Sequence, residues 1–372
     1  MALWPADAPA HDASAWGGVF RTRDAGATWL PVNPSSFVSG AIALAISPAD
    51  PHHLLLATDM GVSRSRNGGR DWAIEGRDLV VAPAFAAVFD ADGERALIAG
   101  ASAILHNIGH GWRQVQSPAG SSPARALVSG SNGRHVYLAG WAGLYRTDDW
   151  GDSWVNVGNG IVAEHVSAVA APLGPSDDVY VVAGGRLWAS ADAGVTWHLR
   201  GEGFPPPALE VVTPDPSDSH RLWSVAAGQV FRTDDQGRHW RAVGVPVPEP
   251  VVARAVAVVD NVILMATDRG LYRGSAGGAR WSLASDNLAA HLEAGLLARD
   301  PRSPATVYVG FSLTPYDALW RRAAEGSGAL SRLELVELAG GLAFLMLLLL
   351  AAVAAVRRLA RTHYPSSRLT PR

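Results

Sequence analysis

The octapeptide TDDWGDSW, from Thr147 to Trp154, decides the fold of this chain. It lies between two segments typical of β-strands, GLYR before it and WVNV, which begins with the final Trp. The hydroxyl of Thr147 and the carboxylate of Asp149 can accept hydrogen bonds from backbone N–H groups of the turn, and Gly151 can adopt the positive φ of a tight reversal. Trp154 is a large apolar side chain that we expect to turn inward. The octapeptide therefore predicts a rigid turn between two strands.

The same pattern returns along the chain at regular spacing. Good copies are TRDAGATW, SADAGVTW and TDDQGRHW; SRNGGRDW has Asn at the acidic position, and LHNIGHGW and GSAGGARW retain the Gly and the Trp. The closing tryptophans follow one another at 43, 40, 42, 43, 43 and 41 residues. They are Trp29, Trp72, Trp112, Trp154, Trp197, Trp240 and Trp281. A period of about 40–45 residues with several short strands per unit is typical of a β-propeller blade.

Each unit also repeats its other strands. ALAISPADPHHLLLAT and LLARDPRSPATVYVG both indicate a strand, an Asp-Pro turn and a second strand. The run VYVVAG is apolar on both faces, as expected for a middle strand covered by neighbouring blades on both sides. A unit is therefore predicted to run inner strand, turn, second strand, loop, third strand, octapeptide turn, outer strand.

The way in which the ring closes is also predicted. The chain begins within a unit at GGVFRTRD, which supplies a third strand, and six whole units follow. The segment from Glu293 to Phe311 supplies the missing first and second strands, so a composite blade joins the two ends and removes exposed edges. The segment from Ala318 to Arg322, ALWRR, resembles one more third strand. We predict an all-β fold: a seven-bladed β-propeller with four-stranded blades over residues 17–322.

The octapeptides resemble the Asp-box, or bacterial neuraminidase repeat: Ser/Thr, any residue, Asp, any, Gly, any, Thr, Trp. Sialidases, xyloglucanases, sortilin receptors and photosystem II assembly/stability factors carry it, and the resemblance covers roughly residues 17–322. It implies a propeller with the box on a peripheral turn, remote from the ligand-binding face. The residues at the third position of the octapeptide are therefore interpreted as structural, and so are the closing tryptophans. The third-position residues are Asp24, Asn67, Asp149, Asp192 and Asp235.

Composition excludes several kinds of site. The net charge of −3 gives no basic face, so nucleic acid is not expected as a partner. The absence of cysteine excludes disulfides, thiolate metal sites, a cysteine nucleophile and a lipidated cysteine. The twelve histidines are scattered, and we predict neither a metal site nor a cofactor.

The C-terminal part of the chain has a different character. From Leu338 to Val356 there are 19 residues without a charge, and as a helix they span about 28 Å, close to the thickness of the hydrocarbon core. We predict a single transmembrane helix contacting membrane lipid, preceded by a linker at 323–337. Five arginines and no acids occur in 357–372, which predicts a cytoplasmic tail and a periplasmic or extracytoplasmic propeller.

Residues 1–16 form an N-terminal extension without a basic start or an apolar segment, so no signal peptide is visible in them. We expect the export signal to be missing from this chain. The alternative is a tail-anchored protein with its propeller inside the cell.

Polar residues are few on the face where propellers usually bind ligands, which is formed by the loops between second and third strands and between blades. We predict binding residues among them, although solvated loop residues are the alternative. They are Asp59, Arg125, Glu164, His165, Arg186, Glu210, Arg254, Asp268, Arg269, Tyr316 and Asp317. An arginine also recurs just before the octapeptide, either as a basic stripe that meets a partner or as a stem packed beside a Trp. The members of this second set are Arg21, Arg64, Arg146, Arg232 and Arg273.

Enzymatic alternatives are less well supported. A sialidase clamps its substrate with three arginines, uses a Tyr–Glu pair, carries an Arg-Ile-Pro stretch and has six blades. A xyloglucanase-like enzyme needs two carboxylates flanking a cleft, normally between two propellers. We therefore predict no catalytic residues. The seven blades and short loops are most similar to the photosystem II assembly-factor type, which implies docking onto an immature membrane complex or a polypeptide. The prediction is a membrane-anchored, non-catalytic scaffold that binds a protein; a glycoside hydrolase or a glycan-binding propeller is the alternative.

Overall fold

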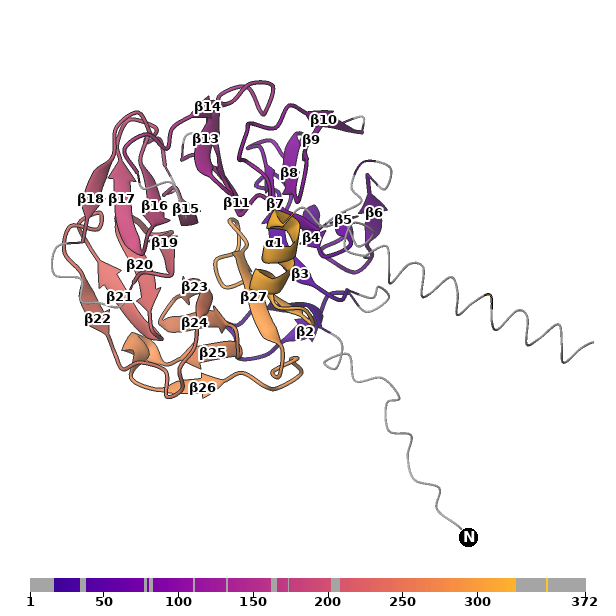
Figure 1. Ribbon diagram of the computed structural model, residues 1–372. Helices are drawn as coiled ribbons and strands as arrows, with labels where there is room; N and C mark the ends of the chain where they lie inside the picture. Colours follow the sequence, from indigo (N-terminus) through magenta and orange to yellow (C-terminus); the bar gives the residue numbers. More distant parts are fainter. Residues whose placement is uncertain are drawn as a thin grey trace, which may run out of the picture. The chain divides into compact units, whose positions relative to one another are not determined.

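Figure 1 shows a computed structural model of the chain. The structure describes residues 17–33, 38–76, 79, 83–109, 111–131, 133–161, 166–172, 174–201, 208–325 and 346. The chain divides into two units, Met1–Ala324 and Glu325–Arg372. All the strands named below and one helix, α1, belong to the first unit, which is a ring of small sheets around an axis (Figure 1).

Seven four-stranded antiparallel sheets form the ring, and six of them each come from one continuous stretch of chain. The first three are β3 (Ala41–Ile46), β4 (Leu54–Thr58), β5 (Gly61–Ser65) and β6 (Ala73–Glu75); β7 (Ala84–Phe89), β8 (Ala96–Gly100), β9 (Ile104–Asn107) and β10 (Trp112–Val115); β11 (Ala126–Ser129), β12 (Val136–Gly140), β13 (Gly143–Thr147) and β14 (Val155–Asn156). The next three are β15 (Val166–Ala170), β16 (Val179–Ala183), β17 (Arg186–Ser190) and β18 (His198–Arg200); β19 (Val211–Asp215), β20 (Asp218–Ala226), β21 (Gln229–Thr233) and β22 (Arg241–Val243); β23 (Ala253–Val259), β24 (Val262–Thr267), β25 (Gly270–Gly274) and β26 (Trp281–Leu283), with the 3-10 turn η3 (Ala276–Gly278) before β26.

The seventh sheet is the predicted composite blade. Its strand order is β2 (Leu30–Pro31), β1 (Gly18–Thr22), β28 (Val307–Ser312) and β27 (Glu293–Arg299). The ladder between β1 and β28 runs from the Gly18–Phe311 pair to the Thr22–Val307 pair, so the two ends of the propeller are joined by hydrogen bonds. Seven blades, four strands per blade and closure by a composite blade are therefore confirmed.

The hydrophobic core lies between neighbouring blades. Every residue of the second strands β4, β8, β12 and β16 is buried, because a sheet lies against each face of these strands. Leu97 of β8 and Leu138 of β12, for example, are fully buried in one cluster shared by adjacent sheets. The predicted two-faced apolar character of the middle strands is confirmed.

The octapeptide turn has the predicted hydrogen bonds. The Thr147 hydroxyl accepts from the N–H groups of Asp149 (3.3 Å) and Gly151 (2.8 Å), and the Asp149 carboxylate accepts from the N–H of Ser153 (2.8 Å). Gly151 has a φ of +92°, which only glycine adopts without strain. Four other turns repeat the hydrogen bond in which the glycine N–H donates to the first hydroxyl. They begin at Thr22, Ser65, Ser190 and Thr233.

The closing tryptophans are less buried than expected. Trp29 is 3% exposed, but the other six are half-buried. The physical reason is that the indole reaches across to the preceding blade. The Nε1–H groups of Trp72, Trp197 and Trp281 donate to backbone carbonyls near the outer edge of that blade, at 2.8, 2.7 and 2.8 Å. The indole therefore joins two blades at the rim rather than filling only its own.

The prediction for the segment from Ala318 to Arg322 is wrong. These residues belong to the helix α1 (Tyr316–Ala324), and the place of the third strand in the closing blade is taken by β1. The apolar side chains recur at Tyr316, Leu319, Trp320 and Ala323, which is a helical period, and the short run looked like a strand only when read without its neighbours. The helix also includes the first two residues of the predicted linker at 323–337.

Other predictions for the ends of the chain fall outside the described residues. These are the N-terminal extension 1–16, the segment from Leu338 to Val356 apart from position 346, and the tail 357–372. Within the part of the chain that the structure describes, no helix has the length and apolar character needed to cross a membrane.

Candidate binding site on the ring axis

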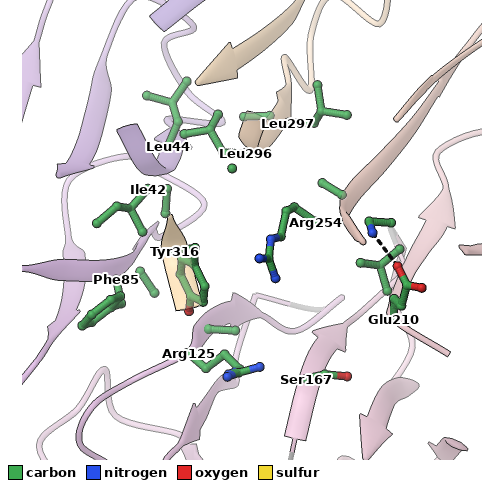
Figure 2. A pocket seen from close by; sticks show the side chains of 18 of the residues that line it. Ile42, Leu44, Phe85, Arg125, Ser167, Glu210, Arg254, Leu296, Leu297 and Tyr316 are labelled. Carbon is green, nitrogen blue, oxygen red and sulfur yellow. Dashed lines mark hydrogen bonds between the residues drawn. The ribbon is translucent and has the colours of Figure 1, made fainter. Parts of the chain in front are cut away.

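A cavity of about 530 Å³ lies where the inner strands of all seven blades converge. Residues of β3, β7, β11, β15, β19, β23 and β27 line it, together with the first turn of α1, so it surrounds the axis of the ring. Figure 2 shows side chains from these different strands pointing toward a common space. Its volume falls in the range of about 300–1,000 Å³ that is common for ligand sites.

The walls of the cavity are mainly apolar. Ile42 and Leu44 from β3, Phe85 from β7, and Leu296 and Leu297 from β27 contribute most of the large side chains (Figure 2). They are available because inner strands of a closed ring have no further strand to cover their axial edge. A ligand in this cavity would gain from burying apolar groups against these residues.

Helix α1 lies at the cavity and joins the closing blade to two others. The Tyr316 ring packs edge-on against Phe85, with centroids 5.9 Å apart. The Trp320 Nε1–H donates to the carbonyl of Ala124 at 2.9 Å, and the Trp320 ring lies 5.0 Å from that of Trp141. In Figure 1 the helix lies near the middle of the ring, close to β7. The chain thus passes from the seventh blade across the face of the ring and is held there by aromatic contacts.

An ion-pair network holds the first turn of α1. Arg254 donates from Nε to Glu293 Oε1 at 2.7 Å and from Nη2 to Asp317 Oδ2 at 2.9 Å. The second Glu293 oxygen accepts from the Tyr316 N–H at 3.2 Å. Burial raises the pKa of Glu293, and the neighbouring Arg254 opposes this shift. Arg254 therefore ties a strand of the sixth blade to the closing blade and to the helix.

Glu210 has its carboxylate committed to the backbone. One oxygen accepts from the N–H of Ala227 at 2.9 Å, and the other accepts from the N–H of Ala253 in the next blade. Burial raises the pKa of Glu210, and these two hydrogen bonds counteract the shift. The side chain acts as a bridge between two blades at the wall of the cavity.

Two donors at the cavity are differently placed. The Arg125 guanidinium lies over the Trp320 ring, 4.2 Å from its centroid, and the described residues offer it no hydrogen-bonding or ion-pair partner. The Tyr316 hydroxyl is buried without a partner in the described part of the chain. Burial raises the pKa of Tyr316 to about 12, so the hydroxyl keeps its proton at neutral pH and can donate it to a hydrogen bond.

The structure brings together five of the predicted binding residues. Arg125, Glu210, Arg254, Tyr316 and Asp317 line the cavity. Each of them lies at the beginning of an inner strand or at the start of α1.

The structure describes four of the remaining predicted residues, and these four do not line the cavity. Asp59 accepts hydrogen bonds from the Ser39 hydroxyl at 2.7 and 2.9 Å, and Asp268 accepts from the Val252 N–H at 2.8 Å. Arg269 lies 3.8 Å from Glu249 in an exposed pair, and Arg186 is exposed at the start of β17. Glu164 and His165 lie outside the described residues.

Sequence reasoning missed the aromatic part of the site. Phe85, Trp141 and Trp320 were not among the predicted residues, although Trp141 occupies a short loop between a second and a third strand and is 46% exposed. A large aromatic residue in an otherwise small loop, AGWAG, was a usable signal. Trp320 could not be placed without recognising α1 as a helix.

The recurring arginines make contacts within the ring. Arg64 and Arg232 lie over the rings of Trp112 and Trp223, at 5.6 and 5.7 Å, as the packing interpretation proposed. The other three instead donate to a carbonyl in the octapeptide turn of the next blade. These bonds are Arg21 to Gly68 (3.3 Å), Arg146 to Ala193 (2.8 Å) and Arg273 to Ala25 (3.3 Å). Four of these arginines, Arg21, Arg64, Arg146 and Arg273, thereby contact the next blade, whereas Arg232 and Trp223 lie on neighbouring strands of one blade.

Within the described ranges, no group of three or more His, Asp or Glu side chains is arranged to hold a metal ion. Comparison by sequence adds no relative: no family model matches the chain, and no curated protein matches it.

Solved structures do match the fold. A structure described as YCF48 bound to D1 peptide superimposes with a TM-score of 0.56 and 16% identity, covering 80% of this chain and 97% of the other. YCF48 from Cyanidioschyzon merolae gives a TM-score of 0.56 and 15% identity, covering 74% of this chain and 96% of the other. The chain shares the propeller fold of YCF48. Since YCF48 is a photosystem II assembly factor, the predicted likeness to that type of propeller is confirmed for the fold.

Proposed function

We propose that the protein is a membrane-anchored, non-catalytic scaffold whose propeller binds a polypeptide partner at the axial cavity. The observation that carries this proposal is the cavity itself. It combines apolar walls such as Leu44 and Leu296 with an arginine, Arg125, that has no described hydrogen-bonding partner. Apolar walls with a few polar groups are typical of recognition sites.

The fold comparison supports a peptide as the kind of partner. One of the structurally similar proteins, YCF48, has been solved with a D1 peptide bound. The D1 peptide is a ligand of YCF48. For this protein we propose only that the partner is likewise a polypeptide. A propeller with a short-loop face and the exposed indole of Trp141, which packs on buried Trp320, suits an extended or helical segment of another protein better than a small polar metabolite.

The arrangement of carboxylates supports a binding role over hydrolysis. A glycosidase needs one carboxylic acid and one carboxylate free to face the bond that is cleaved. Two carboxylates near the cavity, buried Glu293 and half-buried Glu210, have both oxygens occupied by backbone or arginine donors. Neither is free to exchange a proton with a substrate.

Membrane attachment is part of the proposal and depends on the uncharged segment from Leu338 to Val356. The arginines of 357–372 support a cytoplasmic tail with the propeller on the opposite side. Extraction of membranes with alkaline carbonate, followed by protease treatment of sealed vesicles, tests both points. We expect the chain to stay in the pellet and the propeller to be protected in vesicles with the cytoplasmic side outward. Release by carbonate, or digestion of the propeller in such vesicles, would refute this part.

Site-specific crosslinking tests the binding role. A photoreactive amino acid replaces Trp141 at the axial face, and a matched control replaces Val155, which is 55% exposed on the outer strand of the same blade. We expect one discrete protein adduct in intact membranes from position 141 and none from position 155. Equal labelling from both positions, or none from 141, would contradict the proposal.

Turnover assays address the enzymatic alternative. We expect no release of sugar from sialosides or β-glucans by the purified full-length chain. Hydrolysis that survives repeated purification and is abolished in a Glu210→Gln variant would replace the scaffold proposal with a glycosidase.

A further inference from the structure

We propose that Arg125 and Tyr316 form a subsite for a carboxylate that the partner polypeptide carries next to an apolar side chain. This inference rests on the proposed peptide-binding function and specifies the chemical group that the cavity recognises. It depends on the donors at the cavity, their immediate surroundings and the character of the walls.

The first step is a surplus of donors over acceptors. The guanidinium of Arg125 has five N–H donors, and no hydrogen bond from them to a described residue is found. The Tyr316 hydroxyl is buried and lacks a partner among the described residues. A buried polar group such as the Tyr316 hydroxyl is rarely left without a partner, because the unmade bond costs the full desolvation of the group, whereas Arg125 is half-buried. Both side chains line the cavity, so a ligand that accepts hydrogen bonds would satisfy them.

The second step concerns the other polar groups of the cavity. Arg254 is already paired with Glu293 and Asp317, and both oxygens of Glu210 accept from backbone N–H groups. The Ser167 hydroxyl donates to the Val182 carbonyl at 3.3 Å. These groups are occupied within the protein, which leaves Arg125 as the cavity's cation without a described counter-ion. An anion can therefore pair with Arg125, while the lining carboxylates Glu210 and Asp317 balance the charges of the two arginines over the cavity as a whole.

The third step separates a carboxylate from other anions. Arginine binds carboxylates and phosphates through paired N–H groups, so geometry alone does not decide between them. The remaining walls do: Ile42, Leu44, Phe85, Leu296 and Leu297 surround the space with hydrocarbon (Figure 2). A phosphate is strongly hydrated on all sides and would lose water against these walls, whereas a carboxylate attached to an apolar group can place each half against a suitable surface.

Aromatic stacking prepares Arg125 for this role. The centre of the guanidinium lies 4.2 Å from the centroid of the Trp320 ring, and this contact holds the arginine head at the cavity. Trp320 is in turn fixed by its bond to the Ala124 carbonyl and by contact with Trp141. Binding of an anion by Arg125 should therefore alter the fluorescence of this tryptophan pair.

The experiment compares three acetylated leucine-rich tetrapeptides. The first ends in a free carboxylate, the second has the same sequence and ends in an amide, and the third ends in an amide but contains one internal Glu. Affinity for the detergent-solubilised full-length protein is measured by calorimetry, with tryptophan fluorescence as a second readout. We expect at least tenfold tighter binding of one or both carboxylate peptides than of the neutral peptide. The tighter of the two identifies the source as a chain terminus or an acidic side chain.

Variants assign the effect to the subsite. Arg125→Gln should remove the preference for the carboxylate peptides, and Tyr316→Phe, which deletes only the hydroxyl, should reduce it severalfold. Arg269→Gln is the matched control, because Arg269 is an exposed arginine outside the cavity, and should leave all affinities unchanged.

Outcomes that contradict this inference are distinct from those that contradict the proposed function. Equal affinity for all three peptides, abolished when Phe85 is changed to Ala, would keep the peptide-binding function and exclude the carboxylate subsite. A carboxylate preference that persists in Arg125→Gln would also exclude it. Failure of every peptide to bind, together with no adduct from position 141, would overturn both proposals.

Discussion

Side-chain oxygens of Thr147 and Asp149 accept the hydrogen bonds from the backbone N–H groups of the octapeptide turn. In an ordinary hairpin turn, backbone carbonyls accept such bonds. The Thr147 hydroxyl lies inside the turn and accepts from two N–H groups, while it donates to Asp149 Oδ1 at 2.7 Å. Burial opposes ionisation of Asp149, but hydrogen bonds from Ser153 and Thr147 outweigh it and lower the pKa of Asp149. The acid is therefore used within the turn and is not available for chemistry elsewhere.

Replacing Asp149 with Ala should cost about 1–2 kcal/mol of the free energy of unfolding, the value expected for hydrogen bonds to a charged acceptor at a capping position. Chemical denaturation at neutral pH measures it. Asp152→Ala is the control in the same turn: Asp152 is exposed and, among the described residues, pairs with Arg113 alone, so its loss should cost well under about 1 kcal/mol. Similar losses in both variants would show that the turn does not depend on its central acid.

His53 makes the stability of the first blade, β3–β6, depend on pH. It is buried, and its Nε2 lies 2.6 Å from Arg64 Nη1; because arginine only donates, the imidazole accepts and must be neutral. Burial and the charge of Arg64 lower the pKa of His53 to about 4, below its ordinary value of 6.5. The unfolded chain therefore binds a proton between pH 6.5 and 4 that the folded chain does not.

The folded-state pKa of His53 is depressed, so its contribution to stability is complete above pH 6.5 and is lost as the pH falls toward 4. We expect His53→Gln, which keeps an acceptor for Arg64 and cannot titrate, to flatten the fall of the unfolding free energy over this window. His52→Gln, at the neighbouring exposed histidine, is the matched control. Denaturation curves from pH 7 to 4 give the comparison. Parallel slopes for all three proteins would contradict this assignment.

At the scale of elements, α1 stands apart from the ring. Its nine residues are too few to form a stable helix alone, so it depends on packing and on the Arg254 network. The closing blade already has four strands without it. The helix can therefore open while the propeller stays folded, and elements with few buried residues are the first to do so.

Trp320→Ala should detach α1 without unfolding the ring. Truncating a buried Trp costs about 3–5 kcal/mol, and here the loss falls on the helix, since Trp320 is its buried residue. We expect rapid trypsin cleavage after Arg321 and Arg322, with a thermal midpoint close to that of the wild type. Leu313→Ala, an exposed position just before the helix, should leave these sites protected. A large fall in the midpoint, with cleavage sites spread over the blades, would show that α1 and the ring unfold together.

At the scale of the whole molecule, the two ends of the propeller depend on one ladder. β1 is joined to β28 over five residue pairs, and Phe20 meets Phe311 edge to face with centroids 5.6 Å apart. Arg273 adds a bond from the last continuous blade to the Ala25 carbonyl in the closing blade. Closure of the ring turns the inner edge of every sheet toward the axis, where it is shielded from pairing with strands of other chains.

A matched pair of variants tests the closure. Phe20 in GVFRT and Phe231 in QVFRT occupy equivalent third-strand positions, in the composite blade and in a continuous blade. Both changes to Ala should cost about 3–5 kcal/mol of packing. Only Phe20→Ala should also give rapid hydrogen exchange in β1, because that strand has no covalent link to its inner neighbour β28. Equal exchange in β1 and β21 would show that covalent continuity within a blade adds nothing to its local stability.

The blade count, the strand order and the closing blade were predictable, because each depends on residues close together in sequence. Strand alternation, the Asp-Pro turn and the box chemistry act within about 40 residues, and seven copies reinforce one another. The segment from Ala318 to Arg322 was misassigned because five residues are compatible with both the strand period of 2 and the helical period of 3.6. In the structure the helix is held by contacts of Tyr316 with Phe85 and of Trp320 with Ala124. Tertiary contacts commonly override local preference in such short runs.

Arg125, Glu210 and Arg254 were recognised as residues at the ends of inner strands, but their different roles could not be predicted. Glu210 binds the backbone of the next blade, Arg254 pairs with α1, and Arg125 stacks on Trp320 with no described counter-ion. These partners lie between 43 and 195 positions away along the chain. Local chemistry along the sequence thus specifies the blades and their number, because turns and strands form between neighbours. The cavity, with an arginine that has no counter-ion among the described residues, exists only once seven inner strands and one helix meet on a common axis. The curvature of the ring, and not the spacing along the sequence, sets which side chains face each other there.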